Sequence, residues 1–417
     1  MRILLISEAF PPETKSASTL FFELAESLVS KGHQVDFITK MPKANVAQGV
    51  DLKHVSRNEN YKGINVIRLN TPPLPRNIPI VRGLEHFILG FVFFLRGMFV
   101  QKPDVILVYS PPLPLGVTGY WLSVFRRCSV IVNIQDLFPQ AVIDLGLLTN
   151  KVLINLSRHM ERFIYKKASA LTVHSEGNKE YVVSHGAPAK RVEVLHNWVD
   201  TKLISPGKKE NEFSKKYHIE DKFVVSFAGG MGFPQGLGVV IEAADILKEK
   251  KEIMFLLVGD GVKRRELENS VASRELLNVK FIPTQPLDIY PLVLHSSDVG
   301  LVTLVPESKT PVVPGKLFSI MAAGIPVIAS LPMIGDAPKI IHEFQVGLCV
   351  EPANPAQLAE AVLKLYNDPA SRRKMGENGR KAVLAHFSRD QGVEKYITLM
   401  MKLLGRQVFE YNTGSRS

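Results

Sequence analysis

The sequence predicts an α/β protein with two doubly wound domains that face each other across a cleft. Three observations predict this class: short apolar runs alternate with helical patterns, the alternation breaks at residues 197–222, and it then restarts. Runs that are apolar on both faces are typical of parallel sheets covered by helices on two sides. We therefore divide the chain into domains at 1–198 and 199–387.

The N-terminal half begins with a predicted strand at 2–7 and a predicted helix at 20–31, whose apolar residues recur with the helical period. Gly32 follows this helix at the position where glycine commonly ends a helix. The further strands predicted in this half are 35–39, 105–109, 129–134 and 170–174.

The most apolar stretch of the chain is 84–100. Its uncharged core, 87–95, has nine residues, whereas a helix that crosses a membrane needs ~20. We expect a buried helix here, or one that lies in a membrane interface.

The C-terminal half repeats the alternation after a polar linker that contains Pro206 and Gly207. Its predicted strands are 223–228, 253–258, 279–283, 299–304 and 326–329, and its predicted helices are 239–250, 317–323 and 356–366. A last amphipathic helix is expected at 388–405, followed by a polar tail at 406–417.

Composition excludes several classes of protein. Apolar residues make up 46% and charged residues 22%, which is ordinary for a soluble globular chain and argues against disordered or coiled-coil proteins. The two cysteines, Cys128 and Cys349, lie among apolar neighbours and cannot build a disulfide framework. The first apolar run stops at Glu8, too early for an export signal, so we expect a cytoplasmic protein.

The net charge of +11 favours an anionic partner such as a phosphate ester, a nucleic acid or a lipid surface. The excess is concentrated at 151–191, with eight Lys/Arg against three Asp/Glu. Aromatic residues do not interleave with this run, and its apolar residues form one helical face, so we expect no nucleic-acid partner. A solvated basic helix face is the alternative interpretation.

A glycine-rich turn follows the first predicted strand of the C-terminal half. Without Cβ atoms, its backbone N–H groups can approach an anion at the start of the next helix. The pattern favours phosphate binding, and a tight turn packed on the sheet is the alternative. The glycines are Gly229, Gly230, Gly232, Gly236 and Gly238.

A second candidate anion site is the Pro314–Gly315 turn, where Lys316 follows and a helix is predicted at 317–323. Free N–H groups and a mobile positive charge would lie side by side there; an exposed lysine is the alternative. Both turns follow strands of one sheet, whose C-terminal edge is where such sheets bind ligands, so a diphosphate is the simplest ligand.

Asp260 lies between Gly259 and Gly261 at the end of the predicted strand 253–258. This acidic residue resembles the one that holds the ribose in dinucleotide-binding folds, which keeps an NAD(P)-dependent enzyme possible. Against this interpretation, the glycines are spaced GxGxxxG rather than GxGxxG.

In the N-terminal half, Gln135 and Asp136 follow a predicted strand, where substrate-contacting residues often lie. Asp136 has the alternative of capping the next helix. Loop 9–19 follows the first strand, and its hydroxyl residues either line the cleft or cap the helix; they are Ser16, Ser18 and Thr19.

No metal or other cofactor is expected. The sequence contains no Asp-x-Asp pair that would hold a metal on a diphosphate, and its eleven histidines show no zinc spacing. It also lacks the GxxxxGK[ST], HExxH and GxSxG motifs.

Taken together, these motifs resemble the retaining GT-B glycosyltransferases of family four over nearly the whole chain. The segments that carry the resemblance are ISEAFPPE, KGHQVDFIT, VLHNWVD, GGMGFPQGL, VGDG and VPGKLFSIMAAGIPV. The combination of SPPLPLG, QDLFP and NWVD is most similar to a bacterial branch that transfers N-acetylfucosamine-type sugars in surface-polysaccharide assembly.

The resemblance implies a GT-B fold of two Rossmann-like domains, with the final helix crossing back to the first. It implies catalytic roles for Lys316 and Asp136. On the donor side it implies Gly230, Met231, Gly232, Gln235, Gly259, Asp260, Pro283, Thr284, Gln285, Pro314, Gly315, Leu317 and Ser319. On the acceptor side it implies Pro11, Pro12, Glu13, Ser16, Ala17 and Gln135.

The chain departs from the family pattern at several positions. The two glutamates of the common Glu-x7-Glu motif are replaced by Pro311 and Ser319. An arginine is common at Gly230 and a lysine at Gln235, so Lys316 is the main cationic candidate. Gln135 stands where many relatives have histidine.

The expected activity is retaining transfer of a sugar from a nucleotide diphosphate sugar, UDP-linked, to a lipid-linked saccharide in O-antigen or capsule assembly. The expected partners are the nucleotide sugar, the saccharide acceptor and an anionic membrane surface, with the protein peripheral on the inner face of the cytoplasmic membrane. Two alternatives are an NAD(P)-dependent nucleotide-sugar oxidoreductase or epimerase, and a non-catalytic membrane-surface binding protein.

Overall fold

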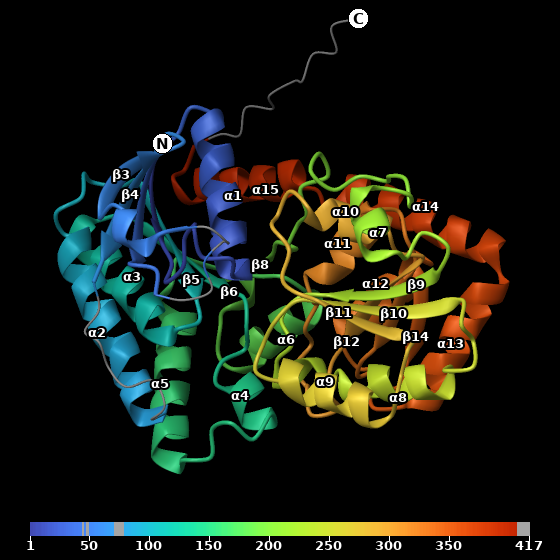
Figure 1. Cartoon of the computed structure of the whole chain (residues 1–417). Helices are drawn as coiled ribbons and strands as arrows, with labels where there is room; N and C mark the ends of the chain where they lie inside the picture. The colour runs from blue at the N-terminus through green and yellow to red at the C-terminus, as the bar shows by residue number, and fades with distance from the viewer. Residues whose placement is uncertain (44–45, 47–49, 71–78, 407–417) are drawn as a thin grey trace, which may run out of the picture.

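The chain folds into two α/β units, each a sheet between layers of helices (Figure 1). The computed structural model describes residues 1–43, 46, 50–70 and 79–406. The predicted tail at 406–417 lies outside the described residues except for Arg406.

The N-terminal sheet has eight strands in the order β3-β4-β2-β1-β5-β6-β7-β8. All neighbours are parallel except β3 and β4. The strands are β1 (Arg2–Ile6), β2 (Gln34–Lys40), β3 (Asn58–Tyr61), β4 (Ile64–Leu69), β5 (Val105–Ser110), β6 (Ser129–Ile134), β7 (Ala170–Val173) and β8 (Val192–Val194).

The C-terminal sheet has six parallel strands in the order β11-β10-β9-β12-β13-β14. They are β9 (Phe223–Ala228), β10 (Ile253–Val258), β11 (Val279–Ile282), β12 (Val299–Thr303), β13 (Val327–Ser330) and β14 (Gly347–Val350). The strand order reverses between β9 and β12, as it does between β1 and β5 in the other sheet. Ligands of open α/β sheets bind at such points, beyond the carboxyl ends of the strands.

Helices cover both faces of each sheet. In the N-terminal unit, α1 covers one face, and α2, α3, α5 and α6 cover the other. In the C-terminal unit, α8, α9 and α13 cover one face, and α7, α10, α11 and α14 the other. The N-terminal helices are α1 (Ser16–Ser30), α2 (Pro79–Gly97), α3 (Leu113–Arg126), α4 (Gln140–Asp144), α5 (Lys151–Lys167) and α6 (Glu176–Ser184).

The remaining helices follow in the second half of the chain. They are α7 (Glu212–Tyr217), α8 (Gly238–Ile246), α9 (Arg264–Ser273), α10 (Tyr290–His295), α11 (Lys316–Ala322), α12 (Asp336–Glu343), α13 (Pro355–Asn367), α14 (Pro369–His386) and α15 (Arg389–Leu403). Within the described residues, no helix has the length and apolar character to cross a membrane.

Several elements were not predicted from the sequence, among them strands β3, β4, β8 and β14 and helix α7. Strand β3 has no fully buried side chain, and its sequence, NENY, lacks the apolar run that identified the other strands. Helix α7 lies within the expected linker, where Asn211 caps it and Phe213 anchors it in the core.

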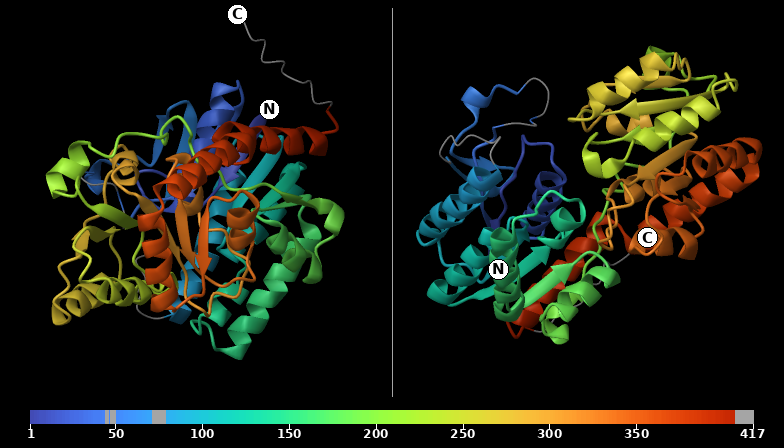
Figure 2. Two further views of the ribbon diagram at one scale, coloured as in Figure 1. Left: turned by 90° about the vertical axis from the view of Figure 1, so that its right-hand side faces the viewer. Right: turned by 90° about the horizontal axis from the view of Figure 1, so that it is seen from below.

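Helix α15 returns from the C-terminal unit and lies against α1 of the N-terminal unit (Figure 2). Its Tyr396 is buried there and packs edge-on against Trp198, with ring centroids 6.1 Å apart. Its Arg389 forms ion pairs with Glu26 at 2.7 Å and with Asp200 at 3.2 Å. The chain therefore crosses between the units twice, and α15 fixes the second crossing to the first unit.

The Tyr396 hydroxyl accepts a hydrogen bond from Asn133 at 2.8 Å and lies 3.2 Å from the Thr172 hydroxyl. We expect Tyr396→Phe to lower the free energy of unfolding by ~1 kcal/mol, because one buried hydrogen-bonding group is lost without a change in shape. Thermal unfolding followed by circular dichroism measures this. Tyr366→Phe is the control, since its hydroxyl has no partner among the described residues; an equal loss in both variants would contradict the explanation.

Candidate active site

The glycine turn after β9 rests on the turn after β10. The Gly229 amide donates to the Val258 carbonyl at 2.9 Å, and the Met231 amide donates to the Asp260 carbonyl at 2.8 Å. A Cβ atom on Gly259 would lie 1.9 Å from the Gly229 carbonyl oxygen, so this close approach requires glycine. The backbone of the β9 turn is thereby held in one conformation.

Two backbone amides of this turn remain available to bind a ligand. The amides of Gly230 and Gly232 donate to no group among the described residues. Gly230 is exposed, and a Cβ at this position would meet no atom within 4 Å, so there is open space beside it. Two unpaired N–H donors at a sheet edge form an arrangement that can accept an anion.

The side chain of Lys316 reaches this turn from the first residue of α11. Its Nζ donates to Gln235 Oε1 at 2.7 Å and lies 3.6 Å from the centroid of the Phe227 ring. A Cβ on Gly229 would lie 3.4 Å from the same Nζ. The two turns that the sequence analysis singled out therefore meet in space.

The environment of Lys316 weakens its positive charge. Its side chain is surrounded by protein, and this desolvation lowers its pKa from 10.5 to about 7. The Phe227 ring and the Gln235 carbonyl oxygen offset the lost hydration in part, because both attract an ammonium group. An anion bound beside Lys316 would restore its full charge.

Met231 and Leu317 do not fit the donor-binding role that the resemblance implied. The Met231 side chain is buried in the core, its amide is bound to Asp260, and its carbonyl accepts from the Lys263 amide at 3.0 Å. Leu317 is fully buried on the sheet side of α11. Both residues support the turns and present no free group to a ligand.

Asp260 also serves its own turn. Its carboxylate accepts from the Gly261 amide at 2.7 Å, and its carbonyl holds Met231. One oxygen of this carboxylate, Oδ1, is engaged within the turn, and the Asp260 side chain is otherwise exposed.

The remaining donor-side residues lie in loops at the same edge of the sheet. Pro283 and Thr284 are exposed after β11, where the Gln285 amide donates to the Pro283 carbonyl at 2.8 Å. Pro314 and Gly315 directly precede Lys316, and Ser319 is half-buried one helical turn further, where it hydrogen-bonds Tyr290.

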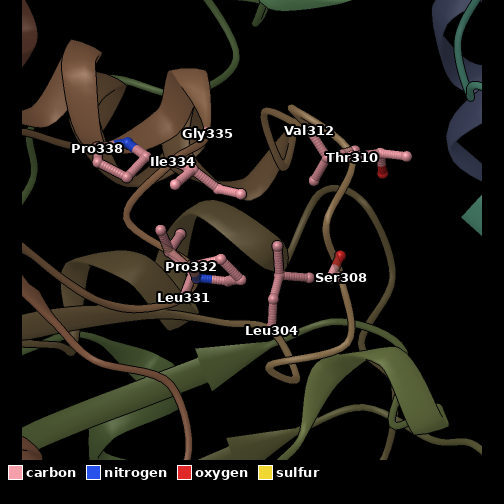
Figure 3. A pocket seen from close by; sticks show the side chains of 9 residues that line it. All are labelled: Leu304, Ser308, Thr310, Val312, Leu331, Pro332, Ile334, Gly335 and Pro338. Atoms are coloured by element: carbon pink, nitrogen blue, oxygen red, sulfur yellow. The ribbon is translucent and has the colours of Figure 1, made fainter. Parts of the chain in front are cut away.

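A small recess lies beside this edge, between the loops that follow β12 and β13 (Figure 3). Its cavity volume is about 10 Å³, far below the ~300 Å³ of the smallest usual ligand pockets. Leu304, Leu331 and Ile334 give it an apolar wall. It is too small to hold a nucleotide.

On the N-terminal side, Asp136 has an exposed side chain at the end of β6. Protein nonetheless surrounds its carboxyl on most sides, and this desolvation raises its pKa. Helix α4 is capped at Pro139, so the helix-capping alternative for Asp136 is wrong. Asp136 is left available to a ligand.

The Gln135 side chain is engaged by neighbouring protein groups, so it is not free for the acceptor-side role that the resemblance implied. It is buried, and its side-chain amide exchanges hydrogen bonds with Asn197 at 2.8 and 3.0 Å and donates to Asn133 at 2.9 Å. Its carbonyl hydrogen-bonds the ring of His174 at 2.9 Å, whose pKa burial lowers to about 4. Gln135 therefore fixes the backbone that carries Asp136.

The loop after β1 is held by charged residues that the sequence analysis did not single out. Arg68 donates to the Pro11 carbonyl at 2.9 Å, and Lys15 and Lys40 lie 3.6 and 3.4 Å from Glu8. Burial raises the pKa of Glu8, but these two lysines outweigh it and lower the pKa overall. Only the three-dimensional fold brings these residues together.

The predicted acceptor residues occupy different environments within this loop. Pro11, Pro12 and Ala17 are half-buried, Glu13 is buried, and Ser16 is exposed at the start of α1. Lys15 occupies the cap position, and no hydroxyl caps α1, so the capping alternative for Ser16, Ser18 and Thr19 is wrong.

A direct contact between the two units reaches the loop that carries Lys316, and sequence reasoning missed it. The Ser175 hydroxyl donates to the Pro311 carbonyl at 3.2 Å, and the Gly177 amide donates to Asp336 Oδ2 at 2.7 Å. Pro311 replaces the first glutamate of the common family motif, so the N-terminal unit touches the donor loop at that position.

Comparisons with known proteins agree with this geometry. Residues 208–382 match the family model for glycosyl transferases group 1, and residues 17–198 match the model for the glycosyl transferase 4-like domain. The chain belongs to this glycosyltransferase family. The assignment decides against the NAD(P)-dependent oxidoreductase or epimerase and against the non-catalytic binding protein.

Relatives of this glycosyltransferase include WcaI of Escherichia coli K12, named as a candidate colanic acid biosynthesis glycosyl transferase. The two are 24% identical over 372 residues, which cover 87% of this chain and 91% of WcaI. A GDP-mannose-dependent alpha-mannosyltransferase of Mycobacterium tuberculosis is 23% identical, with 92% of each chain covered.

Solved structures confirm the predicted GT-B fold of the glycosyltransferase. Sucrose-phosphate synthase from Thermosynechococcus elongatus has a TM-score of 0.78 at 20% identity, with 97% of this chain and 99% of that chain covered. Anabaena HepE, solved in complex with UDP, has a TM-score of 0.72 at 16% identity, with 96% of this chain and 100% of that chain covered.

The contact between the two glycine turns gives a stability prediction. We expect Gly259→Ala to lower the free energy of unfolding by more than ~2 kcal/mol, because the new Cβ would overlap the Gly229 carbonyl and the residue has φ of +146°. Gly232→Ala is the matched control, since its Cβ would find its nearest atom at 3.6 Å and its φ is −96°. Equal melting temperatures for the two variants would contradict the contact.

Proposed function

We propose that this glycosyltransferase moves a sugar, with retention of anomeric configuration, from a UDP-sugar to a lipid-linked saccharide in bacterial surface-polysaccharide assembly. The observation that carries the proposal is the Lys316 amine beside the unpaired amides of Gly230 and Gly232. A cation and two N–H donors at the end of a sheet suit a diphosphate.

The donor would occupy the C-terminal domain, 199–387. Its diphosphate would lie against Gly230, Gly232 and Lys316, its base near 283–285 and its ribose near Ser319. The UDP in the solved HepE complex supports a uridine nucleotide, whereas the mannosyltransferase relative is named for a GDP donor. The proposed site fits the diphosphate that both nucleotides share.

The chemistry follows from where charge develops. When the bond between the anomeric carbon and the diphosphate oxygen breaks, negative charge grows on the departing UDP. The Lys316 ammonium and the two amides stabilise that charge, and stabilisation of this kind is usually the largest catalytic contribution. Desolvation lowers the pKa of Lys316 to about 7 without ligand, and the negative charge of a bound diphosphate would raise this pKa again.

Retention follows if the acceptor oxygen attacks from the face that the diphosphate leaves. The new bond to the anomeric carbon then forms as the old one breaks, and a leaving-group oxygen takes the acceptor proton. No separate general base is needed in this scheme, and no metal. Asp136 would accept a hydrogen bond from the acceptor and hold it in the N-terminal domain, 1–198, which the helix at 388–405 completes.

The acceptor is proposed as a lipid-linked saccharide of O-antigen, capsule or similar assembly, with the protein bound peripherally to an anionic membrane on its cytoplasmic face. The name of the relative WcaI, which refers to colanic acid biosynthesis, supports a surface polysaccharide. The sequence resemblance favours an N-acetylfucosamine-type sugar.

Lys316→Ala tests the catalytic proposal directly. A thermal-shift screen of nucleotide sugars first identifies the donor, since a donor at 100 times its dissociation constant adds ~2.7 kcal/mol of stability. We then expect a rate of UDP release at least ~10²-fold lower in Lys316→Ala, because one charge-stabilising donor is lost. Lys248→Ala, an exposed lysine of the same domain, is the control. A loss below about threefold, against that ~10²-fold scale, would refute the role of Lys316.

The pH dependence of UDP binding tests the charge of Lys316 separately. Above pH 7 the free amine is largely neutral, so binding must take up a proton, and the affinity should fall towards tenfold per pH unit between pH 7 and 9. Lys316→Arg should flatten this dependence, because arginine stays charged throughout. Isothermal titration calorimetry in buffers of different ionisation enthalpy measures the proton uptake. If the wild type bound UDP with the same affinity at pH 7 and at pH 9, binding would not be linked to the protonation of Lys316.

A further inference from the structure

We propose that one face of the N-terminal domain, formed by α2, α3 and α5, binds an anionic lipid bilayer and brings the acceptor end of the cleft to the membrane. We call it the α2/α3/α5 face. The proposal deepens the proposed function, because a lipid-linked acceptor must be reached at a membrane, and it names the surface that makes the contact.

Helix α2 exposes an apolar stripe along its length. Leu84, Phe87, Phe91 and Leu95 recur every three or four residues and are all exposed, with Phe91 at 63%. Phe99, directly after the helix, is 82% exposed. Residues at this spacing lie on one side of a helix, and such a contiguous apolar surface marks an interaction site.

The stripe continues across the neighbouring helices. Phe94 of α2 packs against exposed Phe125 of α3, with ring centroids 5.7 Å apart. Trp121 of α3 is also exposed and stacks on Phe163 of α5 at 6.5 Å. Figure 1 shows the three helices side by side on the outer side of the N-terminal sheet. Aromatic side chains gathered on one helical surface are typical of the membrane interface.

The charge of this face suits anionic lipid. The three helices contain eight Lys/Arg and two Asp/Glu. Both acidic residues, Glu85 and Glu161, are buried, whereas Lys151, Arg162 and Lys166 are exposed. Basic groups beside an apolar surface add to membrane affinity when the lipid is anionic.

Further basic residues lie at the C-terminal ends of α3 and α5. Lys102, Arg127 and Lys167 line a recess there, together with Ser129 and Asp104. Asp104 is engaged by the Arg2 amide at 2.8 Å. The three cations therefore dominate this recess, which adjoins the exposed Val124 of α3 and can receive lipid headgroups.

The same charge argues against a second copy of the chain as the occupant. A twofold-symmetric dimer places a patch against its own copy, so these cations would face one another across the interface. Like charges juxtaposed in this way oppose association, whereas an anionic bilayer neutralises them.

The topology orients the acceptor end of the cleft toward the lipid. Helices α2, α3 and α5 follow β4, β5 and β6 along the chain, so they begin at the carboxyl edge of the sheet. Strand β6 ends at Ile134, and Asp136 follows it at that same edge. The exposed Leu84 and Val152, near the first turns of α2 and α5, therefore lie towards the proposed acceptor site.

The structure also limits which residues can make the contact. Phe93 is fully buried in the domain core and Phe94 is half-buried, so neither belongs to the exposed stripe. Variants of Phe93 would test folding rather than membrane binding, and we exclude it from the experiment.

Vesicle flotation without any nucleotide tests the face independently of catalysis. The vesicles are phosphatidylcholine, alone or with one quarter phosphatidylglycerol. We expect wild-type protein to float with the anionic vesicles, to bind neutral vesicles at least about tenfold more weakly and to dissociate in high salt. The triple variant Phe87→Ser/Phe91→Ser/Phe99→Ser should lose at least about tenfold in affinity. The triple variant Lys151→Gln/Arg162→Gln/Lys166→Gln should lose about 100-fold on anionic vesicles.

A matched control replaces exposed apolar residues of the C-terminal domain: Ile246→Ser/Val262→Ser/Leu277→Ser. It should float as the wild type does. Unchanged melting temperatures, and an unchanged rise of the melting temperature with UDP, show that each variant is folded with an intact donor site. Loss of membrane binding by the α2/α3/α5 face can therefore be told apart from loss of donor binding. Flotation of the Phe triple variant equal to that of the wild type would overturn the proposal, as would wild-type binding that ignores phosphatidylglycerol. A dimer in light scattering that only the Phe triple variant abolishes would also overturn it.

Discussion

The candidate site depends on a contact between two stretches of backbone. The turns after β9 and β10 approach so closely that no side chain fits at Gly259, and the amides of Gly229 and Met231 are consumed in holding the turns together. The amides of Gly230 and Gly232, which alternate with these two along the turn, have no partner among the described residues. Paired and unpaired donors thus arise from the same arrangement, and the anion site needs little from side chains.

Lys316 supplies what this backbone cannot. Gly230 and Gln235 carry no charge, and Lys316 brings an amine to the glycine turn. Gln235 instead contributes a carbonyl oxygen that holds Lys316 over Phe227. The position of the amine is fixed before any ligand arrives, and its charge is weakest when the site is empty.

The sequence was sufficient to predict the fold, and to predict that the glycine turn after β9 and the Pro314–Gly315 turn lie close together. Both predictions depend on local sequence patterns, namely buried apolar runs and glycine-rich turns. It was insufficient where a role depends on which way one side chain points. Leu317 and Lys316 are adjacent, yet one faces the core and the other the site. Gln135 follows a strand as Asp136 does, but its partner Asn197 lies 62 positions away and no local signal reveals it. Strand β3 has no fully buried residue, so its sequence contains no apolar run from which a strand could be predicted.

The two segments that connect the domains lie side by side, because Val199 of the first pairs with Ser388 of the second. Arg389 of the second segment forms ion pairs with Asp200 of the first and with Glu26 of α1. Arg389 thereby joins both crossings to the N-terminal unit. A second contact between the two units runs from the Ser175 hydroxyl to the Pro311 carbonyl, and a displacement of one unit that separated these residues would break it. The loop that leads to Lys316 would then lose its support from the other domain, which couples the order of that loop to closure of the enzyme.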